Sequence, residues 1–168
     1  MASAGNIVKV GPWGDINGGV NPWSFVPASG SKITGIIVTS TDKCIYALTF
    51  IYKTADRISH VSQKFGAQSG GGTDKKVTFA EGEYITGISG TVGVYNGYKV
   101  ITSLTFHGSK KDYGPYGSKS GGTAFSLPVR LGDFVGFYGN YGAYLDNLGV
   151  YLSPPSFLNT SFLSKARS

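Results

Sequence analysis

The stretch Trp13-Gly14-Asp15-Ile16-Asn17-Gly18-Gly19 decides the fold, because its pattern of an aromatic residue, a glycine and a later glycine pair occurs twice more. The second copy is Phe65-Gly66-Ala67-Gln68-Ser69-Gly70-Gly71, and the third is Tyr116-Gly117-Ser118-Lys119-Ser120-Gly121-Gly122. The copies start at residues 13, 65 and 116. A pattern that recurs at a nearly constant interval predicts one structural unit used three times.

The residues after each copy also correspond. Every copy is followed by a phenylalanine in a strand-like run, and later by a short apolar strand. The phenylalanines are Phe25, Phe79 and Phe125, and the closing strands span 47–50, 103–106 and 147–150. Clusters of Gly, Asn, Asp and Ser separate these runs, which is typical of strands and turns. Because one four-stranded sheet cannot bury its apolar face alone, we expect an all-β prism of three sheets around a pseudo-threefold axis, with Phe and Leu pointing inward.

The composition agrees with one β domain. The chain has 168 residues, including 26 glycines, and 14% of them are aromatic but only 14% charged. This composition excludes a disordered chain and disfavours helices. The net charge of +6 permits weak attraction to anions, but the basic residues are scattered, with only pairs at Lys75-Lys76 and Lys110-Lys111. Cys44 is the single cysteine, which excludes an internal disulfide framework.

Sequence motifs for catalysis are missing. His60 and His107 have no Ser-His-Asp or metal-ligand spacing around them, and Glu81 and Glu83 lie in a run typical of a solvated turn. We therefore expect no catalytic residue, no metal and no cofactor. Two alternatives stay open: a glycosidase would need two facing carboxylates, and a nucleic-acid-binding β domain would need aromatic residues in a basic groove and salt-sensitive binding.

The three copies differ at the position before the closing strand, which is Tyr46, Thr102 or Asp146. Asp146 ends the loop Gly142-Ala143-Tyr144-Leu145-Asp146. An ionised carboxylate can accept hydrogen bonds from two neighbouring hydroxyl groups, and a glycine turn leaves main-chain amides open to donate. This combination suits a neutral polyol such as a sugar. The alternative interpretation is that Asp146 only caps its own turn.

These motifs together resemble the jacalin-related lectins, specifically the mannose-binding group of plants. The resemblance covers residues 6–152. It rests on the opening Gly11-Pro12-Trp13-Gly14 with Asn17-Gly18-Gly19, the central Ser103-Leu104-Thr105-Phe106 and Tyr113-Gly114-Pro115-Tyr116-Gly117, and the motif Gly142-x-x-x-Asp146. The resemblance implies a β-prism of three four-stranded Greek-key sheets, and a non-catalytic lectin that binds mannose- or glucose-containing glycans.

The resemblance also implies the site residues. The backbone amides of Gly19, Ala143 and Tyr144 would donate to the sugar, Asp146 would accept from two hydroxyl groups, and Leu145 would fix the turn that starts at Gly142. Secondary contacts would come from Gly18 and from Tyr95 and Asn96 in a neighbouring loop. The galactose-binding members are cut near their N-terminus, whereas this chain runs uncut from Met1 to Gly19. That favours mannose and glucose, with galactose preference as the alternative.

Further expectations follow for the whole chain. Because Tyr46 replaces the acid that some members carry in their first repeat, we expect one sugar site per chain. We expect a single lectin domain over residues 1–152 and a flexible tail over 153–168. The absence of a recognisable signal segment and the resemblance to the mannose-binding group predict a cytoplasmic or nucleocytoplasmic protein. Useful affinity for glycans predicts a homodimer or a larger homo-oligomer.

Overall fold

The structure is a computed structural model, and it describes residues 6–155 of the chain. Within these residues it consists of thirteen strands joined by turns, with no helix. The predicted tail over 153–168 lies outside the described residues from 156 onward. The strands are β1 (Val8–Gly14), β2 (Asn21–Phe25), β3 (Lys32–Ser40), β4 (Ile45–Lys53), β5 (Ser59–Val61), β6 (Phe65–Gly66), β7 (Thr73–Thr78), β8 (Ile85–Tyr95), β9 (Tyr98–Gly108), β10 (Asp112–Gly117), β11 (Thr123–Pro128), β12 (Asp133–Tyr141) and β13 (Leu145–Ser153).

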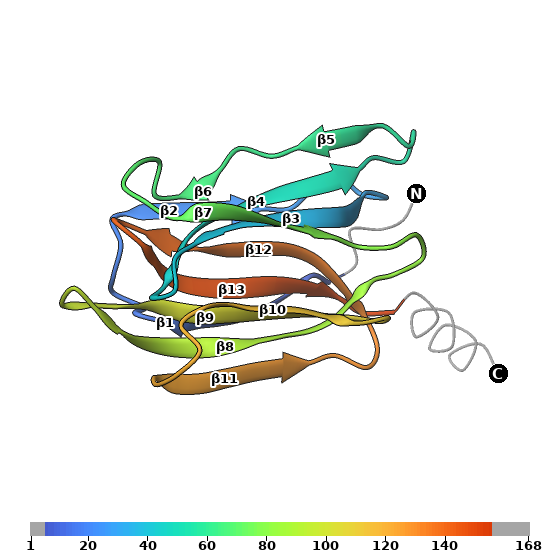
Figure 1. The fold of residues 1–168 in the computed structure, drawn as a ribbon. Coiled ribbons are helices and arrows are strands. Elements are labelled where there is room, and N and C mark those ends of the chain that lie inside the picture. Colours follow the sequence, from blue (N-terminus) through green and yellow to red (C-terminus); the bar gives the residue numbers. More distant parts are fainter. Residues whose placement is uncertain (1–5, 156–168) are drawn as a thin grey trace.

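The strands form three antiparallel sheets that face one another (Figure 1). Sheet A has the order β1-β13-β12-β2, so it joins the first two strands of the described chain to the last two. Sheet B has the order β5-β4-β3-β7, with β6 also paired to β4, and sheet C has the order β10-β9-β8-β11. The all-β prism predicted from the sequence is therefore confirmed. Because sheet A pairs β1 and β2 with β13 and β12, the loop between β1 and β2 lies beside the turn between β12 and β13.

Sheet B differs from the expected four strands, because two short strands replace one edge strand. Both β5 and β6 pair with β4. Between them the side chain of Ser62 takes the place of a main-chain partner: Phe50 donates its amide to Ser62 Oγ at 2.9 Å, and the Ser62 amide donates to Phe50 O at 2.8 Å. The side-chain hydrogen bond interrupts the ladder there, which divides the edge.

The threefold repeat is visible in matching main-chain contacts. The amides of Asp15, Ala67 and Ser118 donate to the carbonyl oxygens of Asp146, Tyr46 and Thr102, at 3.0, 3.1 and 2.8 Å respectively. The preceding glycine of each copy has a positive φ, of 112°, 135° and 90° in turn, and a Cβ there would clash with the same carbonyl oxygen. The structure thus confirms that Tyr46, Thr102 and Asp146 occupy equivalent positions.

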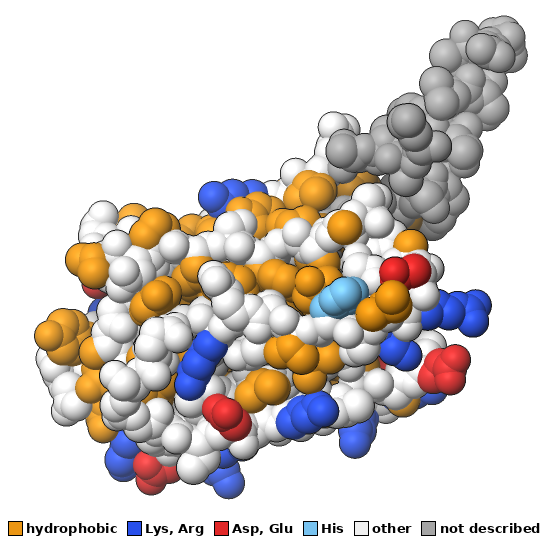
Figure 2. Space-filling view, turned by 90° about the horizontal axis from the view of Figure 1, so that it is seen from above, with side chains coloured by type: hydrophobic (Ala, Val, Ile, Leu, Met, Phe, Trp, Pro, Cys, Tyr) orange, Lys and Arg blue, Asp and Glu red, His pale blue; other side chains and the backbone are white. Residues whose placement is uncertain are grey.

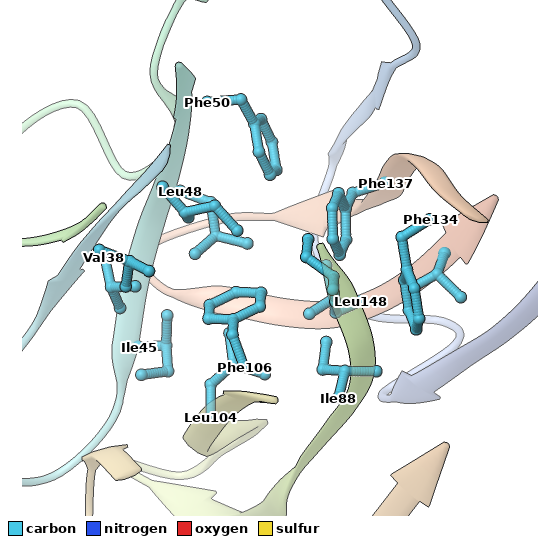
Figure 3. Close-up of a cluster of buried hydrophobic side chains, with 14 of the residues drawn as sticks. Val38, Ile45, Leu48, Phe50, Ile88, Leu104, Phe106, Phe134, Phe137 and Leu148 are labelled. Carbon is cyan, nitrogen blue, oxygen red and sulfur yellow. The ribbon is translucent and has the colours of Figure 1, made fainter. Parts of the chain in front are cut away.

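Aromatic and leucine side chains from all three sheets meet in the centre of the prism (Figure 3). Phe50, Phe106 and Phe137 are fully buried, one from each sheet. The ring centroids of Phe50 and Phe137 lie 5.0 Å apart in a stacked pair, and those of Phe106 and Phe137 lie 6.2 Å apart edge to face. The closing strands contribute Leu48, Leu104 and Leu148, also fully buried. The inward direction predicted for Phe and Leu is confirmed.

Glu83 is a correction to the sequence analysis, which placed it in a solvated turn. Its side chain is fully buried. The carboxylate accepts hydrogen bonds from the Tyr113 hydroxyl at 2.6 Å, the Ala80 amide at 2.8 Å and the Lys110 amide at 3.3 Å. These donors replace water, so the charged group can join the turn after β7 to the β9–β10 hairpin.

The surface carries scattered charges. On the face seen in Figure 2, basic side chains and a few acidic ones are scattered among apolar side chains, and no basic groove is visible there. Among residues 6–155, no helix has the length and apolar character needed to cross a membrane. No group of three or more His, Cys, Asp or Glu side chains in the same residues could hold a metal ion.

Candidate carbohydrate-binding site

Two loops meet at one end of sheet A. The first connects β1 to β2 and contains Gly18 and Gly19; the second is the short turn between β12 and β13. In the second loop the Gly142 amide donates to Tyr144 O at 3.1 Å, which closes the turn. Leu145 follows directly and is fully buried in the core. The burial of Leu145 therefore anchors the end of the turn in the core.

Asp146 lies between these loops, with only 5% of its surface exposed. In the described part of the chain no lysine, arginine or histidine forms an ion pair with it. A Cβ on Gly19 would lie 2.7 Å from Asp146 Oδ2, and a Cβ on Gly142 would lie 3.4 Å from the same oxygen. Gly19 also has a φ of 71°. The structure thus brings Gly19, Gly142 and Asp146 together, and position 19 accommodates only glycine without strain.

The environment of Asp146 acts on its charge. Burial raises the pKa of the Asp146 carboxyl above its ordinary value, the nearby Gly142 amide opposes this rise, and the Asp15 carboxylate adds to it. A buried carboxylate without a cation is costly when it is ionised. Hydroxyl groups of a ligand would supply the hydrogen bonds that the protein leaves unmade.

The main-chain amides around Asp146 are also available. Among residues 6–155, the hydrogen bonds found leave the amides of Gly19, Ala143 and Tyr144 without an acceptor. The Gly18 amide differs, because it donates to Asp15 O at 3.1 Å within its own loop. The corner therefore presents one acceptor group and three free donors, and the geometry makes Gly18 a residue that shapes the loop.

Tyr144 connects this corner to the β8–β9 hairpin. Its ring packs edge to face against Tyr46 and Tyr95, with centroid distances of 5.1 and 5.2 Å. Its hydroxyl oxygen accepts a hydrogen bond from Asn96 Nδ2 at 2.9 Å. The structure thus places Tyr95 and Asn96 beside Tyr144, and their contact with a sugar stays a prediction. These neighbours hold the Tyr144 side chain, and the Tyr144 amide has no acceptor among the described residues.

Three polar residues that hold the loops were missed by the sequence analysis. Asn147 Nδ2 donates to Asp15 O at 2.7 Å, and Asn21 Nδ2 donates to Tyr141 O at 3.1 Å. Asp15 Oδ1 accepts from the Asn17 amide at 3.0 Å, so this second carboxylate near Asp146 is engaged in its own loop. A signal existed for Asn147, because the equivalent residues in the other copies are Ala47 and Ser103.

The other two copies have no carboxylate at the position of Asp146, where Tyr46 and Thr102 stand instead. A Cβ on Gly71 would lie 3.6 Å from ring atoms of Tyr46, which fills this corner in the first copy. In the second, the Thr102 hydroxyl shares a hydrogen bond of 2.7 Å with the Thr91 hydroxyl. Of the three equivalent positions, only the one in the third copy therefore has a carboxylate, Asp146.

A three-sheet prism with one such open corner defines a class of protein, the β-prism lectins. The chain belongs to the jacalin family: the model of the jacalin-like lectin domain matches residues 10–151. This match confirms the family resemblance drawn from the repeated glycine loops and the Gly142-x-x-x-Asp146 motif.

Individual relatives agree with the family. The mannose/glucose-specific lectin of Parkia platycephala is 38% identical over 157 residues, which cover 93% of this chain and 34% of that protein. This chain thus spans about a third of the length of the Parkia relatives. The jacalin-related lectin Calsepa of Calystegia sepium is 39% identical over 148 residues, covering 84% and 92%. A mannose-specific jacalin-related lectin from Morus nigra, solved in complex with mannose, has a TM-score of 0.77 at 33% identity and covers 91% and 98%.

Proposed function

We propose that this domain is a non-catalytic lectin that binds terminal mannose or glucose of glycans through one site per chain. One observation supports the proposal above all: Asp146 is nearly buried, has no cationic partner in the described residues, and faces Gly19 and the turn after β12. A carboxylate in this position is costly to the folded protein unless a ligand binds it.

The chemistry of the ligand follows from the donors and the acceptor. The Asp146 carboxylate accepts from two adjacent sugar hydroxyl groups, and the amides of Gly19, Ala143 and Tyr144 donate to sugar oxygens. The charge at the corner is negative, so a neutral sugar fits better than an acidic one. Relatives named for mannose and glucose support these two sugars, and galactose is the alternative to be tested.

The small number of hydrogen bonds limits the affinity. We expect monosaccharide dissociation constants on the order of millimolar, because few contacts must offset the cost of immobilising the sugar. Several sites held in one assembly raise the effective affinity for a branched glycan. We therefore propose that the protein acts as a homodimer or larger homo-oligomer, which sedimentation of the purified protein can test.

Retention on immobilised mannose tests the proposed function. The wild type should be retained and released by methyl mannoside, while Asp146→Asn should pass through. Asp42→Asn is the matched control, because Asp42 is an exposed acid paired at 4.0 Å with Lys43 at the surface. Retention of Asp146→Asn on the mannose resin would contradict the proposed site. Release of the wild type by galactoside alone would show that the ligand is galactose and not mannose or glucose. Hydrolysis of an aryl mannoside would contradict the non-catalytic assignment.

A further inference from the structure

A hydrogen-bonded chain of three side chains lies on sheet C, outside the proposed sugar site. Ser89 Oγ of β8 lies 2.8 Å from His107 Nε2 of β9, and His107 Nδ1 lies 2.8 Å from Asp112 Oδ1 of β10. The sequence analysis treated His107 as solitary, because Ser89 and Asp112 are 18 and 5 residues away along the chain. Strand pairing in the sheet brings the three together, which corrects that interpretation.

For a neutral His107 ring beside a carboxylate, the chemistry of the groups gives each hydrogen bond a direction. The ionised Asp112 carboxylate can only accept, so His107 Nδ1 carries the proton and donates it. In the neutral ring Nε2 is then an acceptor, and the Ser89 hydroxyl donates to it. A hydroxyl group bound to the free nitrogen of an imidazole, with a carboxylate orienting the ring, is the arrangement that activates serine as a nucleophile.

The three hydrogen-bonded side chains are accessible to reagents in solution. The side chain of His107 is 33% exposed and that of Asp112 is 66% exposed, while Ser89 is half-buried. Ser89 lies inside a strand, in register with Ser126 on one side and Thr105 on the other. Because the sheet uses the main chain of Ser89, its amide is not free to stabilise an oxyanion. This arrangement favours a single covalent event over rapid turnover.

We propose that Ser89 is a nucleophilic serine that accepts an acyl group from an activated ester, with His107 as the base and Asp112 as a positioning residue. Ser89 Oγ attacks the ester carbonyl carbon and forms a new C–O bond, while its proton passes to His107 Nε2. The bond to the aryl oxygen then breaks, and the leaving aryloxide takes that proton. The products are an acylated Ser89 and a free phenol, with His107 neutral again.

An alkyl fluorophosphonate tests the nucleophile, because its reaction follows the same course: an O–P bond forms, the P–F bond breaks, and the proton leaves with fluoride. Mass spectrometry of peptides should find the phosphonyl group on Ser89 of the wild type. In His107→Gln the labelling rate should fall by at least about tenfold, since the base is lost. Ser103→Ala is the matched control and should label normally, because Ser103 bonds only a threonine, Thr91, through its hydroxyl at 2.7 Å.

The role of Asp112 is tested by substitution and rescue. Asp112→Ala should slow the labelling of Ser89, and Asp112→Glu should restore part of it, whereas a merely structural bond would leave the rate unchanged. An unmodified Ser89 in the wild type, or equal rates in wild type and His107→Gln, would overturn the proposal. Retention on mannose should be the same before and after labelling, because Asp146 lies on sheet A, so the two functions can fail independently.

Discussion

Asn147 donates a hydrogen bond of 2.7 Å from its side-chain nitrogen to the carbonyl oxygen of Asp15, and this bond joins strand β13 to the loop between β1 and β2. Only 1% of Asn147 is exposed, and its side-chain oxygen has no partner within the described residues. A buried oxygen without a hydrogen bond is unfavourable. The residue is therefore better suited to positioning the first loop than to stabilising the fold.

Replacing this residue should separate the two roles. The first copy of the repeat has Ala47 at the equivalent position, so Asn147→Ala fits the local backbone. We expect methyl mannoside to bind several-fold more weakly, because the first loop loses a tether, while the free energy of unfolding changes by no more than about 1 kcal/mol. Calorimetric titration and thermal unfolding measure the two effects. Unchanged affinity would show that the tether is dispensable.

Gly19 should tolerate no side chain. In Gly19→Ala the new Cβ would stand 2.7 Å from Asp146 Oδ2 and 2.9 Å from the main chain of Tyr141, in the space between the two loops. We expect mannose binding to be lost. Gly121→Ala is the control, because Gly121 has a similar φ of 79° but no atom within 4 Å of its Cβ position. It bears the same backbone strain, so sugar binding measured by titration should survive in that variant.

The fold could be predicted from the sequence because the same sequence pattern occurs three times, once for each sheet. The three glycine loops and closing strands predicted the three sheets and their buried Phe and Leu positions, and the structure confirms both. Position 146 was found for the same reason, as the acid that breaks a threefold pattern. Its partner Gly19 came through the family resemblance, since no local rule connects residues so distant along the chain.

Other features depend on pairing between strands and left no local pattern. Glu83 sits in a turn that looks solvated, and only the arrival of Tyr113 and Lys110 from the next hairpin makes its burial possible. His107 looked solitary for a similar reason, because its partners lie on neighbouring strands. Side chains that bond across a sheet are visible only once the register is known.

Glu83 should determine part of the acid stability. Burial alone would raise the pKa of the Glu83 carboxyl, but the hydrogen bonds from Tyr113, Ala80 and Lys110 outweigh it and lower the pKa below the ordinary value. A lowered pKa gives stability that is present above the pKa of the unfolded chain and is lost as the pH falls through that of the folded protein. Glu83→Gln should cost about 2 kcal/mol at neutral pH and less in acid.

Chemical denaturation at several pH values measures this difference. Glu81→Gln is the natural control, because Glu81 is an exposed acid two residues away. The free energy of unfolding of Glu81→Gln should equal that of the wild type at every pH tested. If Glu83→Gln and the wild type lost stability in parallel as the pH fell, the hydrogen bonds to the Glu83 carboxylate would not be the cause of the dependence.

Tyr46 should keep the first corner of the prism closed to sugar. Tyr46 is nearly buried, and its ring lies next to Gly71. In the third copy the equivalent pair is Asp146 and Gly19. We expect a titration with methyl mannoside to give one site per chain. Tyr46→Phe should preserve this number and the affinity, since the ring still fills the corner. A second equivalent of bound sugar in the wild type would contradict the assignment.

Asp146 should lower the stability of the folded protein at the pH where it binds sugar. Burial raises the pKa of the Asp146 carboxyl in the folded state, and the Gly142 amide only partly offsets this rise. The folded protein therefore favours the neutral carboxyl. For an acid with a raised pKa, the stabilising contribution is present below the pKa of the unfolded chain and is lost as the pH rises through that of the folded protein. At neutral pH the ionised group therefore opposes folding.

Two measurements follow for Asp146→Asn. Its midpoint of thermal unfolding should exceed that of the wild type at neutral pH, and the difference should shrink in acid, where the wild-type carboxyl also becomes neutral.

In the wild type, mannose binding should weaken on acidification at a pH above the ordinary carboxyl pKa of 3.8, because the protonated group accepts hydrogen bonds less well. Asp42→Asn should shift neither curve. A variant that loses both sugar binding and stability would show that Asp146 holds the loops together, whereas higher stability without binding would show that this carboxylate is retained for the ligand at the expense of the fold.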